Sequence, residues 1–222
     1  YHEPESVAAQ FALSTTEINW FTQSDPRAFS TDTYRRTRAL ATVMEESRCS
    51  CAHLIRHQST LQDLEDYFSS EYFHKVITNR GSMNLEFFSY LEDLSEKTKA
   101  HHRLKDLIRL EKGIALVRRA GNEPAQKGVK LKLSPRVEIM TLNQGTLDHF
   151  QRTERSLLKH PIEARAGVID IAFPLPSMDL DGSTLKEKIL IELPSQSEAP
   201  TIETPPPALY ELLNATRTPQ PE

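Results

Sequence analysis

The chain has 222 residues, 38% of them hydrophobic and 26% charged, values typical of a folded soluble protein. No apolar run approaches the roughly 20 residues that a membrane-spanning helix needs, and the first residues lack a secretory pattern. Two cysteines, Cys49 and Cys51, are too few for a disulfide framework. We therefore expect a cytoplasmic protein without membrane contact, built as one large domain or two small ones.

Helical periodicity marks the chain up to about residue 122. Ser14 or Thr15 is expected to cap an early helix that has Glu17 in its first turn. The clearest helix covers His101–Ala120, where apolar residues form one face and Gly121 follows as the expected C-terminal cap. Further helices are expected at 7–13, 16–21, 31–46, 49–57, 61–68, 69–80 and 82–94.

The hydrophobic period changes to two in the second part of the chain. Residues 121–128 are polar and rich in helix breakers, so we place a domain boundary there. After it, strands are expected at 129–133, 137–139, 168–173 and 188–193, with helices at 145–158 and 208–215. The predicted fold class is α+β: an all-α domain over 1–122, a small α+β domain over 129–216 and a disordered tail at 217–222.

Charge is distributed unevenly along the chain. Residues 97–136 contain twelve Lys and Arg against three Asp and Glu, whereas the residues after Pro161 contain ten acidic and four basic side chains. The basic residues of the 101–120 helix are expected on its outer face: Arg103, Lys105, Arg109, Lys112, Arg118 and Arg119. This pattern allows a DNA-binding regulator that uses the second domain. Because basic helix faces are usually just solvated, nucleic acid is not the favoured partner.

A second alternative is a metal-dependent enzyme. Cys49, His53 and His57 recur every four residues and share a helix face, and thiolate and imidazole groups suit zinc or copper. A structural site needs four convergent ligands, so small buried cysteines beside surface histidines are the more ordinary interpretation. Phosphate-binding glycine loops, G-x-S-x-G and H-E-x-x-H are all absent from the sequence. We therefore expect no catalytic residues, no metal and no cofactor in this chain.

Two consecutive helical segments carry a family resemblance. The segment GSMNLEFFSYLEDL contains an F-x-x-[FY]-L pattern, and RLKDLIRLEKGIALVRRA contains D-L-x-R-L-E. Together with LKLSPRVEIM, KILIEL and ALYELLNA, they resemble the partner subunits of multinuclear non-heme iron enzymes of the DUF692 group, which modify ribosomally made peptides. The matching residues are Phe87, Phe88, Tyr90, Leu91, Asp106, Leu107, Arg109, Leu110, Glu111 and Ala120. The chain departs from the family pattern at Lys112, where an aromatic residue is usual, and at Gly81, which is displaced.

The resemblance implies a non-catalytic accessory subunit. It would bind the leader of a precursor peptide and present the peptide's cysteine to a separate enzyme that carries the iron, in thiaglutamate-type or methanobactin-type biosynthesis. Its winged-helix-like second domain would bind the leader by strand addition. A hairpin of 168–173 with 188–193 is the candidate edge, and its candidate peptide-binding residues are Val168, Ile169, Ile171, Phe173, Ile189 and Ile191. An internal sheet with covered edges is the alternative.

The resemblance also bears on the charged residues of the 101–120 helix. Asp106, Arg109 and Glu111 are expected to hold neighbouring helices rather than to touch a substrate.

Overall fold

The structure is a computed structural model that describes residues 14–23, 32–57, 61–97, 102–120, 133–160, 163–165, 168–170, 175–176, 185–193 and 199–216. The expected helix at 7–13, the Gly121 cap, the 121–128 boundary, the strand residues 129–132 and the tail lie outside the described residues. The proposed division into two domains therefore stays a prediction. Within the described ranges, none of the helices combines the length and apolar character needed to span a membrane.

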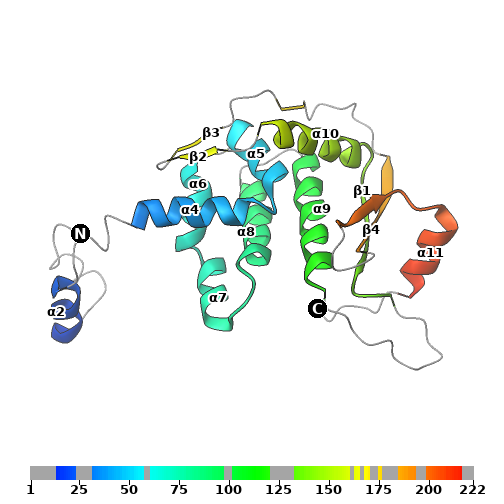
Figure 1. The fold of residues 1–222 in the computed structure, drawn as a ribbon. Helices are drawn as coiled ribbons and strands as arrows, with labels where there is room; N and C mark the ends of the chain where they lie inside the picture. Colours follow the sequence, from blue (N-terminus) through cyan, green and yellow to red (C-terminus); the bar gives the residue numbers. More distant parts are fainter. Residues whose placement is uncertain are drawn as a thin grey trace.

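The first part of the described chain is helical, as its periodicity predicts (Figure 1). Ser14 caps α2: its N–H donates to the Glu17 carboxylate at 2.8 Å, and the Glu17 N–H donates to Ser14 Oγ at 3.3 Å. The elements are α2 (Thr15–Gln23), α4 (Asp32–Met44), α5 (Arg48–His57), α6 (Leu61–Glu65), the 3-10 helix η1 (Asp66–Ser69), α7 (Glu71–Asn79), α8 (Met83–Lys97) and α9 (His102–Arg119).

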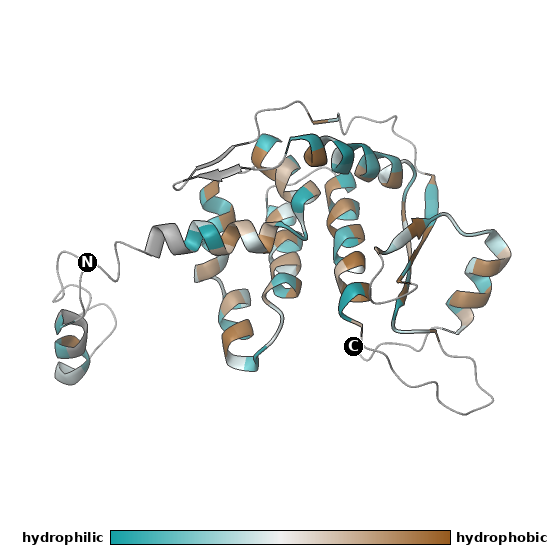
Figure 2. Cartoon of the chain, viewed as in Figure 1, coloured by the Kyte–Doolittle hydropathy of each residue, from teal (hydrophilic) through white to brown (hydrophobic). Residues whose placement is uncertain are grey.

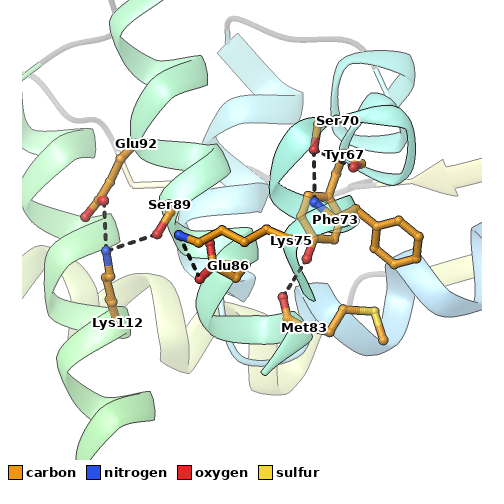
Figure 3. A network of polar contacts seen from close by, with 9 residues as sticks. All are labelled: Tyr67, Ser70, Phe73, Lys75, Met83, Glu86, Ser89, Glu92 and Lys112. Carbon is orange, nitrogen blue, oxygen red and sulfur yellow. Dashed lines mark hydrogen bonds and ion pairs between the residues drawn. The ribbon is translucent and has the colours of Figure 1, made fainter. Parts of the chain in front are cut away.

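The expected helix at 61–68 instead ends at Glu65 and tightens into η1. Both the N–H and the hydroxyl of Ser70 donate to the Tyr67 carbonyl, at 3.0 and 2.6 Å, which closes a short turn. The Tyr67 hydroxyl then donates to the Met83 carbonyl at 2.8 Å (Figure 3). The Tyr67 ring packs edge-on against Phe87. The turn thus places a buried aromatic residue between α7 and α8.

The helix α9 is the centre of the fold, because elements from both halves of the chain pack on it. Its predicted apolar residues Leu104, Leu107, Ile108, Ile114 and Ala115 are all buried. Figure 1 shows α8 on one side of α9 and the strands β1 and β4 on the other, and Figure 2 shows hydrophobic residues along these elements. The buried core is therefore continuous from the helices to the sheet.

The predicted basic face of α9 is correct in part. Arg103 is only 3% exposed, because α10 covers the first turn of α9, so its expected place on the outer face is wrong. Lys112 donates to Glu92 on α8 at 2.9 Å (Figure 3), and Lys105 lies 3.3 Å from Glu96. Two of the expected outward lysines therefore form ion pairs with α8.

The second part of the described chain adds strands, which confirms a mixed α+β fold that is mostly helical. The antiparallel order β1-β4-β5 makes one sheet, and β2 pairs with β3 in another. The expected 168–173/188–193 hairpin is wrong, because these two segments belong to different sheets. The elements are β1 (Val137–Asn143), α10 (Thr146–Lys159), β2 (Glu163–Arg165), β3 (Val168–Asp170), β4 (Lys186–Glu192), β5 (Thr201–Glu203) and α11 (Pro207–Ala215).

The three-stranded sheet lies between α9 and α11 (Figure 1). Gly113 allows α9 to approach the sheet closely, since a Cβ at this position would lie 2.5 Å from Met140 Cε and 3.0 Å from Ile191 Cδ1. On the opposite face, the Tyr210 and Thr141 hydroxyls are 2.9 Å apart. The sheet is therefore fixed by apolar contact on one face and partly by polar contacts on the other.

Candidate functional site

The carboxylate of Glu111 holds the beginning of α5. It accepts hydrogen bonds from the N–H groups of Cys49 at 2.8 Å and Ser50 at 3.0 Å, and from the Ser50 hydroxyl at 2.5 Å. The first N–H groups of a helix have no partners within the helix, so a carboxylate there is favourable. Burial nevertheless raises the pKa of Glu111 to about 7, against 4.5 for an ordinary glutamate.

The other carboxylate of the D-L-x-R-L-E segment has a similar role. Asp106 is 5% exposed and accepts hydrogen bonds from the backbone N–H of Asn143 at 2.7 Å and from its side-chain amide. Arg109 lies 3.4 Å from the same carboxylate. The expectation that these residues hold neighbouring helices is confirmed for Glu111, whereas the element held by Asp106 is the end of β1. Arg109 pairs with Asp106 on its own helix.

Among the described residues, Cys49 and His53 do not meet at a common site, and His53 is 1% exposed, so its expected surface position is wrong. Cys49 and Cys51 are fully buried, and burial raises the pKa of both thiols. His53 instead contacts α10, with its Nε2 2.9 Å from Nε2 of His149. The side chain of His57 lies outside the described residues. No group of three or more His, Cys, Asp and Glu side chains in the described ranges is arranged to hold a metal ion.

His149 is a buried residue that the sequence patterns did not single out. It is 1% exposed, and burial lowers its pKa to about 4. Thr153, one turn further along α10, lies with its hydroxyl 3.3 Å from His53 Nε2. The available signal was the spacing of His149 and Thr153 with the apolar residues Phe150 and Leu157, which places all four on the inward side of α10.

An open cleft of about 530 Å³ lies where five helices, α4, α5, α8, α9 and α10, approach the sheet. Three of its charged side chains are held in two ion pairs: Arg48 is 2.6 Å from Glu154, and Glu46 is 2.7 Å from Arg119, which lies outside the lining. The cleft is lined by Thr42, Glu45, Glu46, Arg48, Asn84, Glu111, Ile114, Arg118, Phe150, Glu154, Ala199, Pro200 and Ile202. It therefore combines a carboxylate-rich wall with apolar side chains from α9, α10 and β5.

The strand β5 borders this cleft, and the register of the sheet determines which of its backbone groups are available. Leu193 N–H donates to the Arg136 carbonyl at 3.0 Å, and Gln144 N–H donates to the Leu185 carbonyl at 2.9 Å. Hydrogen bonds alternate along an antiparallel strand, so the odd-numbered residues of β4 point their backbone groups toward β1. The even-numbered residues of β4 therefore point toward β5.

On β5, the residues opposite those even-numbered positions are Glu203, across from Leu190, and Thr201, across from Glu192. Ile202 lies between them and directs its own N–H and C=O away from the sheet. No other strand in the described part of the chain pairs with β5. The outer edge of β5 therefore presents one N–H and one C=O beside the cleft.

The six sequence-predicted peptide-binding residues are not gathered at this edge. Ile189 and Ile191 are fully buried on β4, the middle strand of its sheet. Val168 and Ile169 lie on β3, in the other sheet, and their side chains are outside the described residues. Ile171 and Phe173 are also outside them. The sequence patterns missed β5, whose three residues are too few to show a clear alternation.

No protein-family model matches this sequence, and no curated protein matches it. The resemblance to DUF692 partner subunits therefore stays a prediction.

Proposed function

We propose that the chain is a non-catalytic cytoplasmic partner subunit, which binds the leader of a ribosomally made precursor peptide and presents the peptide's cysteine to a DUF692-type enzyme. The partner enzyme supplies the iron and all of the chemistry. In this proposal, the unit formed by the sheet with α10 and α11 serves as a winged-helix-like peptide-recognition element. The chain and the enzyme form a heterodimer.

The observation that carries this proposal is the edge of β5. Ile202 directs an N–H and a C=O outward, which are the two groups that an added strand uses. The adjoining cleft of about 530 Å³ gives side chains of that strand a place beside α9 and α10. A peptide bound there would gain backbone hydrogen bonds from β5 and selectivity from the cleft.

The two carboxylates of the D-L-x-R-L-E segment support the same proposal indirectly. Asp106 holds the end of β1, and Glu111 holds the beginning of α5. Both groups are used inside the fold, so the segment that carries the resemblance fixes the helices against the sheet. A recognition surface at β5 depends on that arrangement.

Affinity capture of the full chain from its native cells tests the proposal. We expect an iron-containing protein and a short cysteine-containing peptide to copurify, detected by metal analysis and mass spectrometry. The variant Ile202→Pro should lose the peptide and keep the enzyme, because proline removes the outward N–H. The matched control Ile202→Ala shortens the side chain, keeps the N–H and should retain the peptide. Capture without any iron protein, or without a peptide, contradicts the proposal.

A further inference from the structure

The face of β5 that borders the cleft determines which residue of a bound peptide strand directs its side chain into the cleft. The side chain of Ile202 lines the cleft and packs against the core. Residues directly opposite each other on paired strands place their side chains on the same face of the sheet. The peptide residue that pairs with Ile202 therefore directs its side chain into the cleft.

The charges of the cleft favour a cation at that position. Four of its lining residues are glutamates and two are arginines. Glu154 and Glu46 are already held in ion pairs with Arg48 and Arg119. Outside these pairs, the lining holds two carboxylates and one arginine, Arg118. Glu45 is exposed and has no ion pair among the described residues, and the partners of Glu111 are the neutral groups of Cys49 and Ser50. The carboxylates therefore outnumber the arginine.

The remaining lining is suited to the stem of a long basic side chain. Ile114, Phe150 and Ile202 supply apolar surface from three different elements. Lysine and arginine place their methylene groups on such surface and keep the charged end with polar groups. The cleft offers this combination, with carboxylates beside apolar side chains.

We propose that the cleft beside β5 selects a peptide with a lysine or arginine at the position that pairs with Ile202. This inference rests on the proposed function and adds the chemistry of the recognised residue. Because burial raises the pKa of Glu111 to about 7, a bound cation should favour its ionised form and release a proton. Binding should therefore strengthen as the pH rises through 7 and weaken with added salt.

A displayed library of random peptides, selected on the full chain, tests this specificity. We expect lysine or arginine to be enriched about fivefold at one position, which corresponds to about 1 kcal/mol for a partly exposed ion pair. Selection on Glu45→Lys should lose that enrichment. The matched control is Glu203→Lys, an equal charge change on the opposite face of β5, and it should keep the enrichment.

Two contrary results have different meanings. If the recovered peptides depend on the Ile202 N–H, as judged from Ile202→Pro and Ile202→Ala, but show no basic preference, the inference fails and the proposed function stands. If no recovered peptide loses binding on Ile202→Pro, peptide recognition at β5 fails and the inference fails with it. Circular dichroism of each variant shows whether its fold is retained.

Discussion

The two edges of the three-stranded sheet differ in how their backbone groups are satisfied. At the β1 edge, Val137 N–H donates to the Ser134 carbonyl at 3.0 Å, and Asn143 N–H donates to the buried carboxylate of Asp106 at 2.7 Å. At the β5 edge, Ile202 directs its N–H and C=O outward beside the cleft. One edge is thus closed at both ends by the chain itself, whereas no strand in the described part of the chain pairs with the outer side of the other.

The open edge is also short. Pro200 precedes β5, and three prolines follow it within four residues. Short edge strands and flanking prolines are common ways to prevent uncontrolled pairing between sheets. In the proposed function, this edge would accept a brief strand, and the neighbouring cleft would supply the selectivity.

The largest effect on stability is expected from opening the closed edge. Asp106→Ala should lower the free energy of unfolding by about 2–4 kcal/mol, because it removes a buried carboxylate and leaves the partly buried amide groups of Asn143 without their acceptor. Glu203→Ala, at the exposed edge, should change it by less than about 0.5 kcal/mol. Urea denaturation measures both values. Equal effects of the two substitutions would contradict the difference between the edges.

Proline substitutions within β5 sharpen the assignment of its two sides. Glu203→Pro removes an N–H that points toward β4, so we expect a loss of about 1–3 kcal/mol. Ile202→Pro removes the outward N–H, and its cost should be smaller by about 1 kcal/mol. Thermal and urea denaturation provide the comparison. If Ile202→Pro proves the more destabilising of the two, the register assigned to the open edge is wrong.

The contact between His53 on α5 and His149 on α10 predicts how the stability of the fold depends on pH. Burial lowers the pKa of His149 to about 4, so the unfolded chain binds a proton near pH 6.5 that the folded chain does not. Stability from this group is therefore lost as the pH falls from 6.5 toward 4, by about 1–2 kcal/mol at pH 5. Glu111 acts in the opposite direction, because its raised pKa favours the folded state below pH 7.

The two titrations are separated by substitution. In the Glu111→Gln background, the free energy of unfolding should be lower at pH 5 than at pH 7, and the further change His149→Gln should remove most of that difference. Denaturation curves at the two pH values measure it. An unchanged pH dependence after His149→Gln would show that the His53–His149 contact does not control acid stability.

The sequence predicts helices and strands well where a segment has a clear and sustained hydrophobic pattern. The helix α9 and the strand β4 are both found near their expected positions, because each has a clear apolar periodicity. The pairing of β4 was wrong, since its partners β1 and β5 are selected by contacts between distant parts of the chain. Burial of Arg103 likewise depends on α10 and is not visible in the local pattern.

The candidate edge β5 was not predicted from the sequence, and strand addition itself stays a prediction. Strand addition was expected at a sheet edge, but β5 consists of Thr-Ile-Glu between prolines and carries almost no pattern of its own. The cleft likewise brings together Glu45, which follows α4, Glu111 on α9 and Glu154 on α10. No spacing in the sequence indicates that these three residues lie near one another. Glu111 was expected to have a structural role. That it also lines the cleft is visible only in the folded structure.

Amide hydrogen exchange at Ile202 tests the central claim most directly. In the free chain, the Ile202 N–H should exchange faster than those of Thr201 and Glu203, which point toward β4. With a bound leader peptide, the Ile202 amide should become protected by about tenfold or more, while the Asn143 amide, already bonded to Asp106, should change little. Peptide binding that leaves exchange at Ile202 unchanged would contradict strand addition at β5.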